Sequence, residues 1–171
     1  MEALDLSTAY PDVLLLVGTQ TGHAEWVAEE LAEALDALGF DVDLQLMMDA
    51  EAALLEDASQ LVICTSTHGQ GALPEGSQPL FDALAEGAPD LAHVAFGVVA
   101  LGDHAYEPHF IAAARQWQRL LKRCGALEAT DPYVIDQGPT RDDLEGVASW
   151  GRRLATAFAA AFADEPGELR S

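Results

Sequence analysis

Residues 13–24 read VLLLVGTQTGHA, and this stretch decides the fold. Its first part, Val13 to Val17, is a continuous apolar run, which is typical of a parallel strand buried on both faces. The polar turn Gly18 to Gly22 follows at once. A helix is predicted next, because apolar residues recur three and four positions apart from Ala24 to Leu38 and form one stripe. Gly39 is placed to end that helix, so the stretch predicts a strand–loop–helix unit.

The same pattern recurs along the rest of the chain. Further strands are predicted at Phe40–Leu46, Leu61–Thr65, Val94–Leu101 and Tyr133–Ile135, and further helices near Pro79–Glu86, Phe110–Arg123 and Leu144–Phe162. Five strands that alternate with helices predict an α/β protein with a doubly wound parallel sheet and helices on both faces. The common strand order for five strands is 2-1-3-4-5, which brings the loops after strands 1, 3 and 4 together at one edge of the sheet.

The chain has 171 residues, half of them hydrophobic. This size suits one domain with its own core, so we assign residues 1–171 to a single domain whose core runs from about 12 to 162. Met1 to Tyr10 and Asp164 to Ser171 are expected to be loose ends. No apolar run approaches the roughly 20 residues of a membrane span. Met1 to Asp12 lacks the basic and then apolar order of a secretory signal, so we expect a cytoplasmic protein.

The formal net charge is −21. Nucleic acids and anionic membranes are disfavoured as partners, because binding them requires clustered Lys and Arg. A basic protein partner is favoured, since opposite charges speed encounter. Solubility or adaptation to salt would explain the acidity equally well. Cys64 lies in an apolar run and is expected to be buried and inert, and its spacing from Cys124 fits neither a metal site nor a redox pair.

The loop Gly18 to Ala24 joins a strand to a helix start and carries two threonines. Free backbone N–H groups and the helix dipole make such a place suitable for an anion. The loop has no lysine, so it is not an NTP-binding P-loop, and it has no Gly-x-Gly-x-x-Gly pattern for a dinucleotide. Two interpretations stay open, namely a neutral cradle for one phosphate and a plain helix cap by Thr19 or Thr21.

Two later loops carry residues that suit a planar ligand. Thr65 to Gly71 contains His68 and two glycines, which permit positive φ and close approach of the backbone. Leu101 to Glu107 contains Tyr106, whose amphipathic ring suits the face of a planar ligand. Simpler interpretations are a loop histidine bonded to backbone, a glycine turn and a surface tyrosine.

Together the three loops resemble those of the flavodoxin family. Thr19 to Glu25 looks like the phosphate loop of flavodoxins and of the FMN domains of diflavin reductases. Ser66 to Gly71 is similar to their second flavin loop, and Leu101 to Tyr106 is similar to the third. The histidine in the second loop particularly resembles the short-chain, MioC-type flavodoxins. The resemblance spans about Asp12 to Phe162 and implies a flavodoxin-like fold with FMN as the cofactor.

The resemblance also implies the contacts to FMN. Thr19, Gln20, Thr21, Gly22, His23 and Ala24 would hold its phosphate through backbone N–H and hydroxyl groups. His68 and Tyr106 would flank the isoalloxazine ring, Gly69 would meet its N5 atom, and Gly102 and Asp103 would lie along its pyrimidine edge. Ser66, Thr67, Gln70, Gly71, Leu101 and Phe110 complete the expected contacts. Asp136 matches an acidic position near the flavin, and a turn residue before Gly138 explains it equally well.

Three positions depart from the family pattern. His68 stands where the diflavin domains usually have tyrosine, so stacking there is expected to be weaker or pH-dependent. Ala72 replaces the usual acid after Gly71. Pro108 adds one residue between Tyr106 and Phe110, which puts the alignment of Phe110 with the family's aromatic residue in doubt.

The resemblance implies a monomeric, low-potential one-electron carrier between a flavoprotein reductase and an electron-acceptor protein. The net charge favours basic docking surfaces on both of these partners. In this interpretation the flavin does the redox chemistry and the protein tunes it. An FMN-dependent oxidoreductase that acts directly on a small substrate such as a quinone is the alternative. A cofactor-free interaction module is a third possibility. A phosphoacceptor receiver domain is excluded, because threonines and Ser66 stand where it needs acidic residues and a phosphorylatable aspartate.

Overall fold

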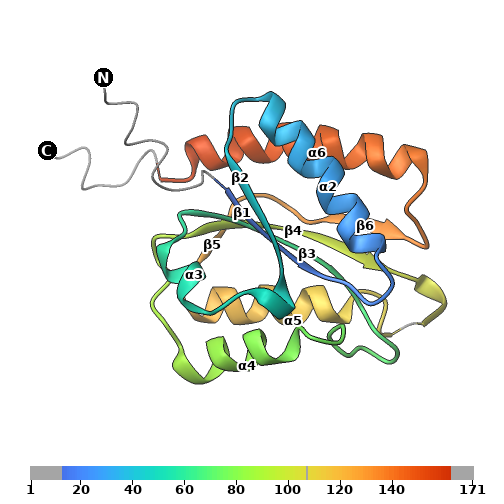
Figure 1. The fold of residues 1–171 in the computed structure, drawn as a ribbon, viewed down its shortest axis with the longest axis horizontal. Coiled ribbons are helices and arrows are strands. Elements are labelled where there is room, and N and C mark those ends of the chain that lie inside the picture. Colours follow the sequence, from blue (N-terminus) through green and yellow to red (C-terminus); the bar gives the residue numbers. More distant parts are fainter. Residues whose placement is uncertain (1–12, 107, 163–171) are drawn as a thin grey trace, which may run out of the picture.

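A parallel sheet forms the centre of the computed structural model, which describes residues 13–106 and 108–162. Its strands lie in the order β2 (Val42–Leu46), β1 (Val13–Gly18), β3 (Gln60–Ser66), β4 (Ala95–Gly102) and β5 (Leu127–Glu128), and β6 (Tyr133–Asp136) also pairs with β4. All of these pairs are parallel. The predicted order 2-1-3-4-5 is confirmed (Figure 1).

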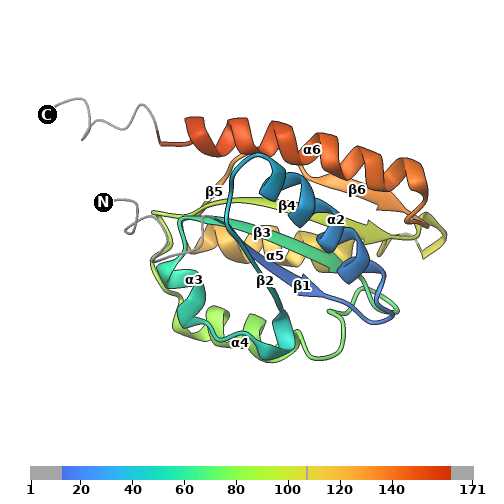
Figure 2. The same cartoon turned by 45° about the horizontal axis from the view of Figure 1, so that its top comes forward.

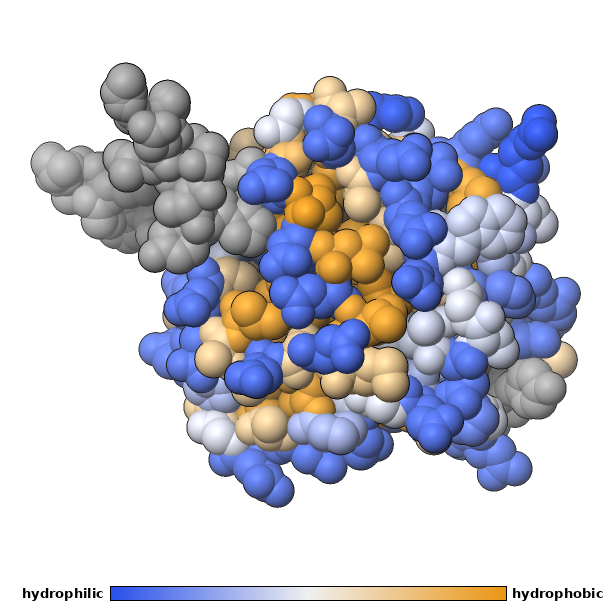
Figure 3. Space-filling model, viewed as in Figure 1, coloured by the Kyte–Doolittle hydropathy of each residue, from blue (hydrophilic) through white to orange (hydrophobic). Residues whose placement is uncertain are grey.

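Burial along the strands follows their place in the sheet. All six residues of β1 are buried, as its continuous apolar run predicts for a strand covered on both faces. The edge strand β2 alternates apolar and polar residues, and each of its residues is half-buried. Figure 3 shows an apolar area in the middle of one molecular face, over this edge strand, with hydrophilic residues around it.

Helices cover both faces of the sheet (Figures 1 and 2). α2 (His23–Ala37) and α6 (Arg141–Ala160) pack on one face, in a core cluster that includes Trp150. α4 (Gln78–Gly87) and α5 (Ala112–Arg123) pack on the other, in a cluster that includes Trp117. Among the described residues, no helix combines the length and the apolar character needed to cross a membrane.

The two helices on the first face begin differently. Thr140 caps α6 through a reciprocal capping box with Asp143, so this helix begins earlier than the predicted Leu144. α2 begins after Gly22, which has a φ of 95°, and no side chain of the described residues caps it. At its other end the Gly39 N–H donates to the Asp36 carbonyl with a φ of 99°, which confirms Gly39 as the residue that ends the helix.

Four short elements were not predicted from the sequence. These are the 3₁₀ turns η1 (Met47–Asp49) and η2 (His104–Tyr106), the helix α3 (Ala53–Asp57) and the strand β5. Each is too short to show a periodic apolar pattern. β5 and β6 pair with the two ends of β4, so together they fill the position that the prediction gave to one last strand. The expected loose ends, Met1 to Tyr10 and Asp164 to Ser171, lie outside the described residues.

Candidate functional site

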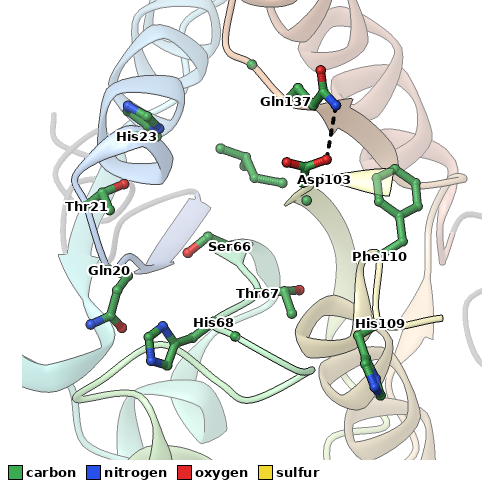
Figure 4. A pocket seen from close by; sticks show the side chains of 14 residues that line it. Gln20, Thr21, His23, Ser66, Thr67, His68, Asp103, His109, Phe110 and Gln137 are labelled. Atoms are coloured by element: carbon green, nitrogen blue, oxygen red, sulfur yellow. Dashed lines mark hydrogen bonds between the residues drawn. The ribbon is translucent and has the colours of Figure 1, made fainter. Parts of the chain in front are cut away.

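The carboxyl ends of β1, β3, β4 and β6 meet at one edge of the sheet and enclose a cleft of about 420 Å³ (Figure 4). The residues that line it come from four loops that are far apart in the sequence. They are Gln20, Thr21 and His23, then Ser66, Thr67, His68 and Gly69, then Leu101, Gly102, Asp103, His109 and Phe110, and finally Gln137 and Gly138. This is where parallel α/β sheets bind ligands, at the point where the strand order reverses.

The first loop presents the free end of α2 to the cleft. The Gly22 N–H donates to Thr19 Oγ1 at 2.8 Å, a contact inside the loop that holds its turn. Neither threonine caps the helix, so the plain helix-cap interpretation is wrong. The Gln20 side chain accepts from the Glu75 N–H at 2.8 Å, which ties this loop to the segment after β3. Uncapped N–H groups at the positive end of a 15-residue helix form a ready anion site.

The second loop is a tight turn held by its own backbone. His68 and Ala72 exchange two backbone hydrogen bonds of 2.8 Å, and Gly69 and Gly71 between them have φ values of 53° and 103°. The predicted positive φ at both glycines is confirmed. The His68 imidazole makes no hydrogen bond with the described residues, and it points into the cleft (Figure 4).

Ser66 and Thr67 enter the second loop with different hydrogen bonding. Thr67 Oγ1 accepts from the Ala113 N–H at 3.1 Å, which fixes the start of α5 against the loop. Ser66 Oγ is buried and has no partner among the described residues. A buried hydroxyl without a partner is costly, and Ser66 Oγ shares this state with Trp117 Nε1 in the core; Ser66 differs in that its residue lines the cleft.

The third loop is joined to the fourth through two carboxylates. Asp103 accepts from the Ala105 N–H at 2.9 Å and from Gln137 Nε2 at 3.0 Å. These hydrogen bonds, that of the Ala105 N–H foremost, hold the pKa of Asp103 below its usual value. Asp136 accepts from the His104 N–H at 3.0 Å and lies 2.7 Å from His104 Nδ1. The carboxylates therefore brace the two loops against each other.

The close approach of the Phe110 carbonyl requires glycine at position 102. A Cβ atom built there would overlap the Phe110 carbonyl oxygen, so the chain after β4 folds back directly over this residue. The contact brings Phe110 to the wall of the cleft, despite the extra residue Pro108 before it. Residues of the third loop thus reach the cleft because position 102 has no side chain.

Cys64 lies beneath the first loop, where its Sγ donates to the Ala24 carbonyl at 3.4 Å. It is fully buried, and burial raises the pKa of its thiol far above the usual value. Burial also raises the pKa of Cys124, and both cysteines are free thiols. A thiol kept neutral is a poor nucleophile, so the expectation that Cys64 is buried and inert agrees with the structure.

The structure brings most of the predicted site residues together. Those that line the cleft are Gln20, Thr21, His23, Ser66, Thr67, His68, Gly69, Leu101, Gly102, Asp103 and Phe110. Thr19, Gly22 and Ala24 are not among the lining residues, and Thr19 lines a smaller neighbouring pocket. Gln70 and Gly71 face a neighbouring groove, and Asp136 is bound to His104 at the rim. The side chain of Tyr106 lies outside what the structure describes, so its predicted place beside the ring stays a prediction.

Sequence reasoning missed His109, Gln137 and Gly138 as lining residues. Gln137 and Gly138 follow the last strand, and its carboxyl end lies at the same edge as the others, so the topology rule applied to that strand would have found them. His109 gives no such signal. Its ring points away from the centre of the cleft (Figure 4).

The cleft suits a planar molecule with a phosphate. Its volume lies within the roughly 300–1,000 Å³ of small-molecule sites. The helix end offers N–H groups for a phosphate, while His68 and Phe110 offer flat surfaces on other walls. No Lys or Arg is among the described lining residues, and Asp103 is the carboxylate among them. An anion held in this cleft would therefore bind through neutral donors, and further negative charge on the ligand would be disfavoured.

Three comparisons with known proteins agree on the relationship. A family model described as Flavodoxin matches residues 15–151. Protein MioC of Escherichia coli (strain K12) is 36% identical over 146 residues, which cover 81% of this chain and 95% of MioC. The sulfite reductase [NADPH] flavoprotein alpha-component of Mannheimia succiniciproducens is 36% identical over 116 residues, which cover 67% of this chain and 19% of that protein. The solved structure of oxidised Flavodoxin 2 from Bacillus cereus is 28% identical, with a TM-score of 0.77 over 88% of this chain and 99% of that one.

Proposed function

The chain belongs to the flavodoxin family, whose cofactor is FMN, and on that premise we propose that it carries single electrons at low potential between a reductase and an acceptor protein. One observation carries the proposal. A single cleft joins the uncapped end of α2 to the loops after β3, β4 and β6, with no Lys or Arg among its described lining residues. FMN, when bound, supplies a ring that takes up and gives back electrons.

The first loop is the proposed phosphate site. Backbone N–H groups at Gln20, Thr21, His23 and Ala24 and the hydroxyl of Thr21 would hold the phosphate at the helix end, while the Gly22 N–H is already bound to Thr19 Oγ1. The contact between Thr19 Oγ1 and the Gly22 N–H supports this role, because it holds the loop in shape before any ligand binds. Preorganised donors bind more tightly, since they lose less freedom on binding.

The other loops are the proposed ring site. The free faces of His68 and Phe110 support contact with the ring, and the same role is proposed for Tyr106. Ser66 Oγ is the proposed hydrogen-bonding group, because no described residue satisfies it. Gly69 would bring the backbone close to the ring edge, and Gly102 and Asp103 would lie along another edge.

The electrostatics of the cleft support a low potential. Reduction that adds negative charge is disfavoured where Asp103 is ionised and no described Lys or Arg lies nearby. The net charge of −21 acts in the same direction. The same charge supports basic docking surfaces on the two partner proteins.

Relatives support the proposed partners. The Mannheimia relative is named a flavoprotein component of an NADPH sulfite reductase, and the match covers 19% of its length. We therefore propose that the reductase partner of this chain is a separate flavoprotein. We also propose that the carrier works as a monomer.

Potentiometry of the FMN-loaded protein tests the carrier role. We expect two well-separated one-electron steps, with the second below the value for free FMN. A single two-electron step would contradict the proposal. Mixing the protein with NADPH and a quinone, without a reductase, separates the carrier from a direct oxidoreductase. Rapid turnover there would favour the oxidoreductase.

A further inference from the structure

A second hollow, the basic groove, lies beside the cofactor cleft and has an unusual charge. It has a volume of about 490 Å³ and lies between the turn at Gln70 and Gly71 and the helix α5. Arg115 and Arg119 line it, and no Asp or Glu is among its described lining residues. The whole chain has 29 acidic residues and 8 Lys and Arg, so a groove with two arginines and no described carboxylate is contrary to its composition.

The two arginine side chains have no partner among residues 13–106 and 108–162. They are four residues apart on α5, so their side chains leave the same side of the helix about 5–6 Å apart at Cβ. Both are exposed, and neither guanidinium has an ion pair or hydrogen bond with the described residues. Lys122 on the same helix is different, because it pairs with Glu128 at 2.9 Å.

The wall opposite the arginines is fixed in place. Gln116 Nε2 donates to the Gly71 carbonyl at 2.8 Å, which ties the turn to α5. His109 Nδ1 lies 3.1 Å from where a Cβ on Gly71 would be, so the histidine packs tightly on the turn. His109 also lines the cofactor cleft, so a ligand in the basic groove would lie next to that cleft.

We propose that the basic groove binds a small molecule that carries a diphosphate group. Each guanidinium presents a planar fork that matches a phosphate group with two hydrogen bonds, and two forks on one helix side match two linked phosphates. A small ligand is favoured over an acidic protein, because a second acidic surface would face the net charge of −21 over its whole area. A small anion meets mainly the local arginines, since salt screens charges beyond about 8 Å.

Calorimetric titration of the FMN-loaded protein with inorganic pyrophosphate tests the proposal, because FMN fills the other anion site. We expect Arg115→Gln with Arg119→Gln to weaken binding at least tenfold. The matched control is Arg152→Gln with Arg153→Gln, which makes the same change of charge on exposed positions of α6 and is expected to stay within twofold of the unaltered protein. Arg115→Lys with Arg119→Lys keeps the charge without the forks and is expected to fall between the two.

Equal losses in the two glutamine double variants would overturn the proposal, because they would show a general effect of charge. Absence of pyrophosphate binding, or tighter binding of a hexaglutamate peptide, would overturn it as well. Pyrophosphate binding in the basic groove and FMN binding in the cleft can be tested independently of each other. If the protein does not retain FMN, the same variants are compared on the protein as purified, since neither arginine lines the cofactor cleft.

Discussion

Ser66 and Thr67 are adjacent at the cleft, but their hydroxyl groups differ in hydrogen bonding. Ser66 Oγ is buried without a described partner, while Thr67 Oγ1 accepts a hydrogen bond from the Ala113 N–H. Neighbouring residues of the same chemical class thus have different tasks. Thr67 stabilises the start of α5, whereas no described residue satisfies the Ser66 hydroxyl.

Replacing Ser66 separates stability from binding. We expect Ser66→Ala to leave the unfolding free energy of the FMN-free protein unchanged or raised, because it removes a buried hydroxyl that lacks a partner. We expect the same change to weaken FMN about 2- to 10-fold, the worth of one hydrogen bond. Urea unfolding and flavin fluorescence titration measure the two effects. Thr67→Val is the contrast and should lower stability, and a Ser66→Ala protein that binds FMN normally would contradict the assignment.

Gly102 tests the close approach of the third loop. We expect Gly102→Ala to lower the unfolding free energy by at least about 2 kcal/mol, because the new Cβ would overlap the Phe110 carbonyl oxygen. Gly87→Ala is the matched control, since a Cβ there meets nothing within 4 Å. Gly87→Ala should stabilise the protein by about 0.4–1 kcal/mol, because alanine lowers the conformational entropy of the unfolded chain. Equal effects of the two changes in urea unfolding would contradict the close contact.

At the scale of elements, α2 shows what the sequence can and cannot predict about a helix. The apolar stripe from Ala24 to Leu38 predicts the helix and its buried face correctly as far as Leu35, but Leu38 lies beyond the helix and is 47% exposed, so its predicted place in the stripe is wrong. The sequence leaves the state of its first turn open, because Thr19 and Thr21 fit both a cap and a phosphate cradle. Only the fold shows that the Thr19 hydroxyl turns to the Gly22 N–H and leaves the helix end free.

Short elements and contacts between distant residues could not be predicted from the sequence, for a physical reason. β5 has two residues and pairs with Ala95 and Phe96, so its strand character comes from a neighbour and not from its own pattern. Gln137 reaches the cleft by hydrogen bonding to Asp103, which is 34 residues away. Such contacts depend on the register between loops, which local periodicity does not encode.

The link between the loops after β4 and β6 predicts a pH effect. The fold lowers the pKa of Asp103, mainly through the Ala105 N–H, so it favours the charged carboxylate. This stabilisation is present above the ordinary pKa of about 3.9 and is lost as the pH falls through the lowered value. We therefore expect Asp103→Asn to be less stable than the unaltered protein at pH 7, and the gap to close at acid pH.

Urea unfolding across this pH range measures the effect. Asp49→Asn is the control, because Asp49 has no hydrogen bond or ion pair with the described residues. It should show no gap that depends on pH in the same way. A gap of constant size for Asp103→Asn would contradict the link.

The whole molecule carries a charge that the fold must tolerate. Twenty-one excess negative charges repel one another in the folded state, where they are closer together than in the unfolded chain. Raising the ionic strength from about 0.01 M to about 0.15 M shortens the screening distance from about 30 Å to about 8 Å. We therefore expect the urea midpoint at neutral pH to rise with NaCl. Near the isoelectric point of about 4.2 the rise should vanish, and a falling midpoint at neutral pH would contradict the argument.

One measurement tests the central claim most directly, namely that this fold holds one FMN with its phosphate at the end of α2. The FMN-free protein is titrated in parallel with FMN and with riboflavin, and the visible absorption and flavin fluorescence are followed. We expect FMN to bind at one equivalent with shifted absorption bands, and riboflavin, which lacks the phosphate, to bind at least tenfold more weakly. Spectra that equal the sum of protein and free flavin, or equal affinity for the two flavins, would contradict it.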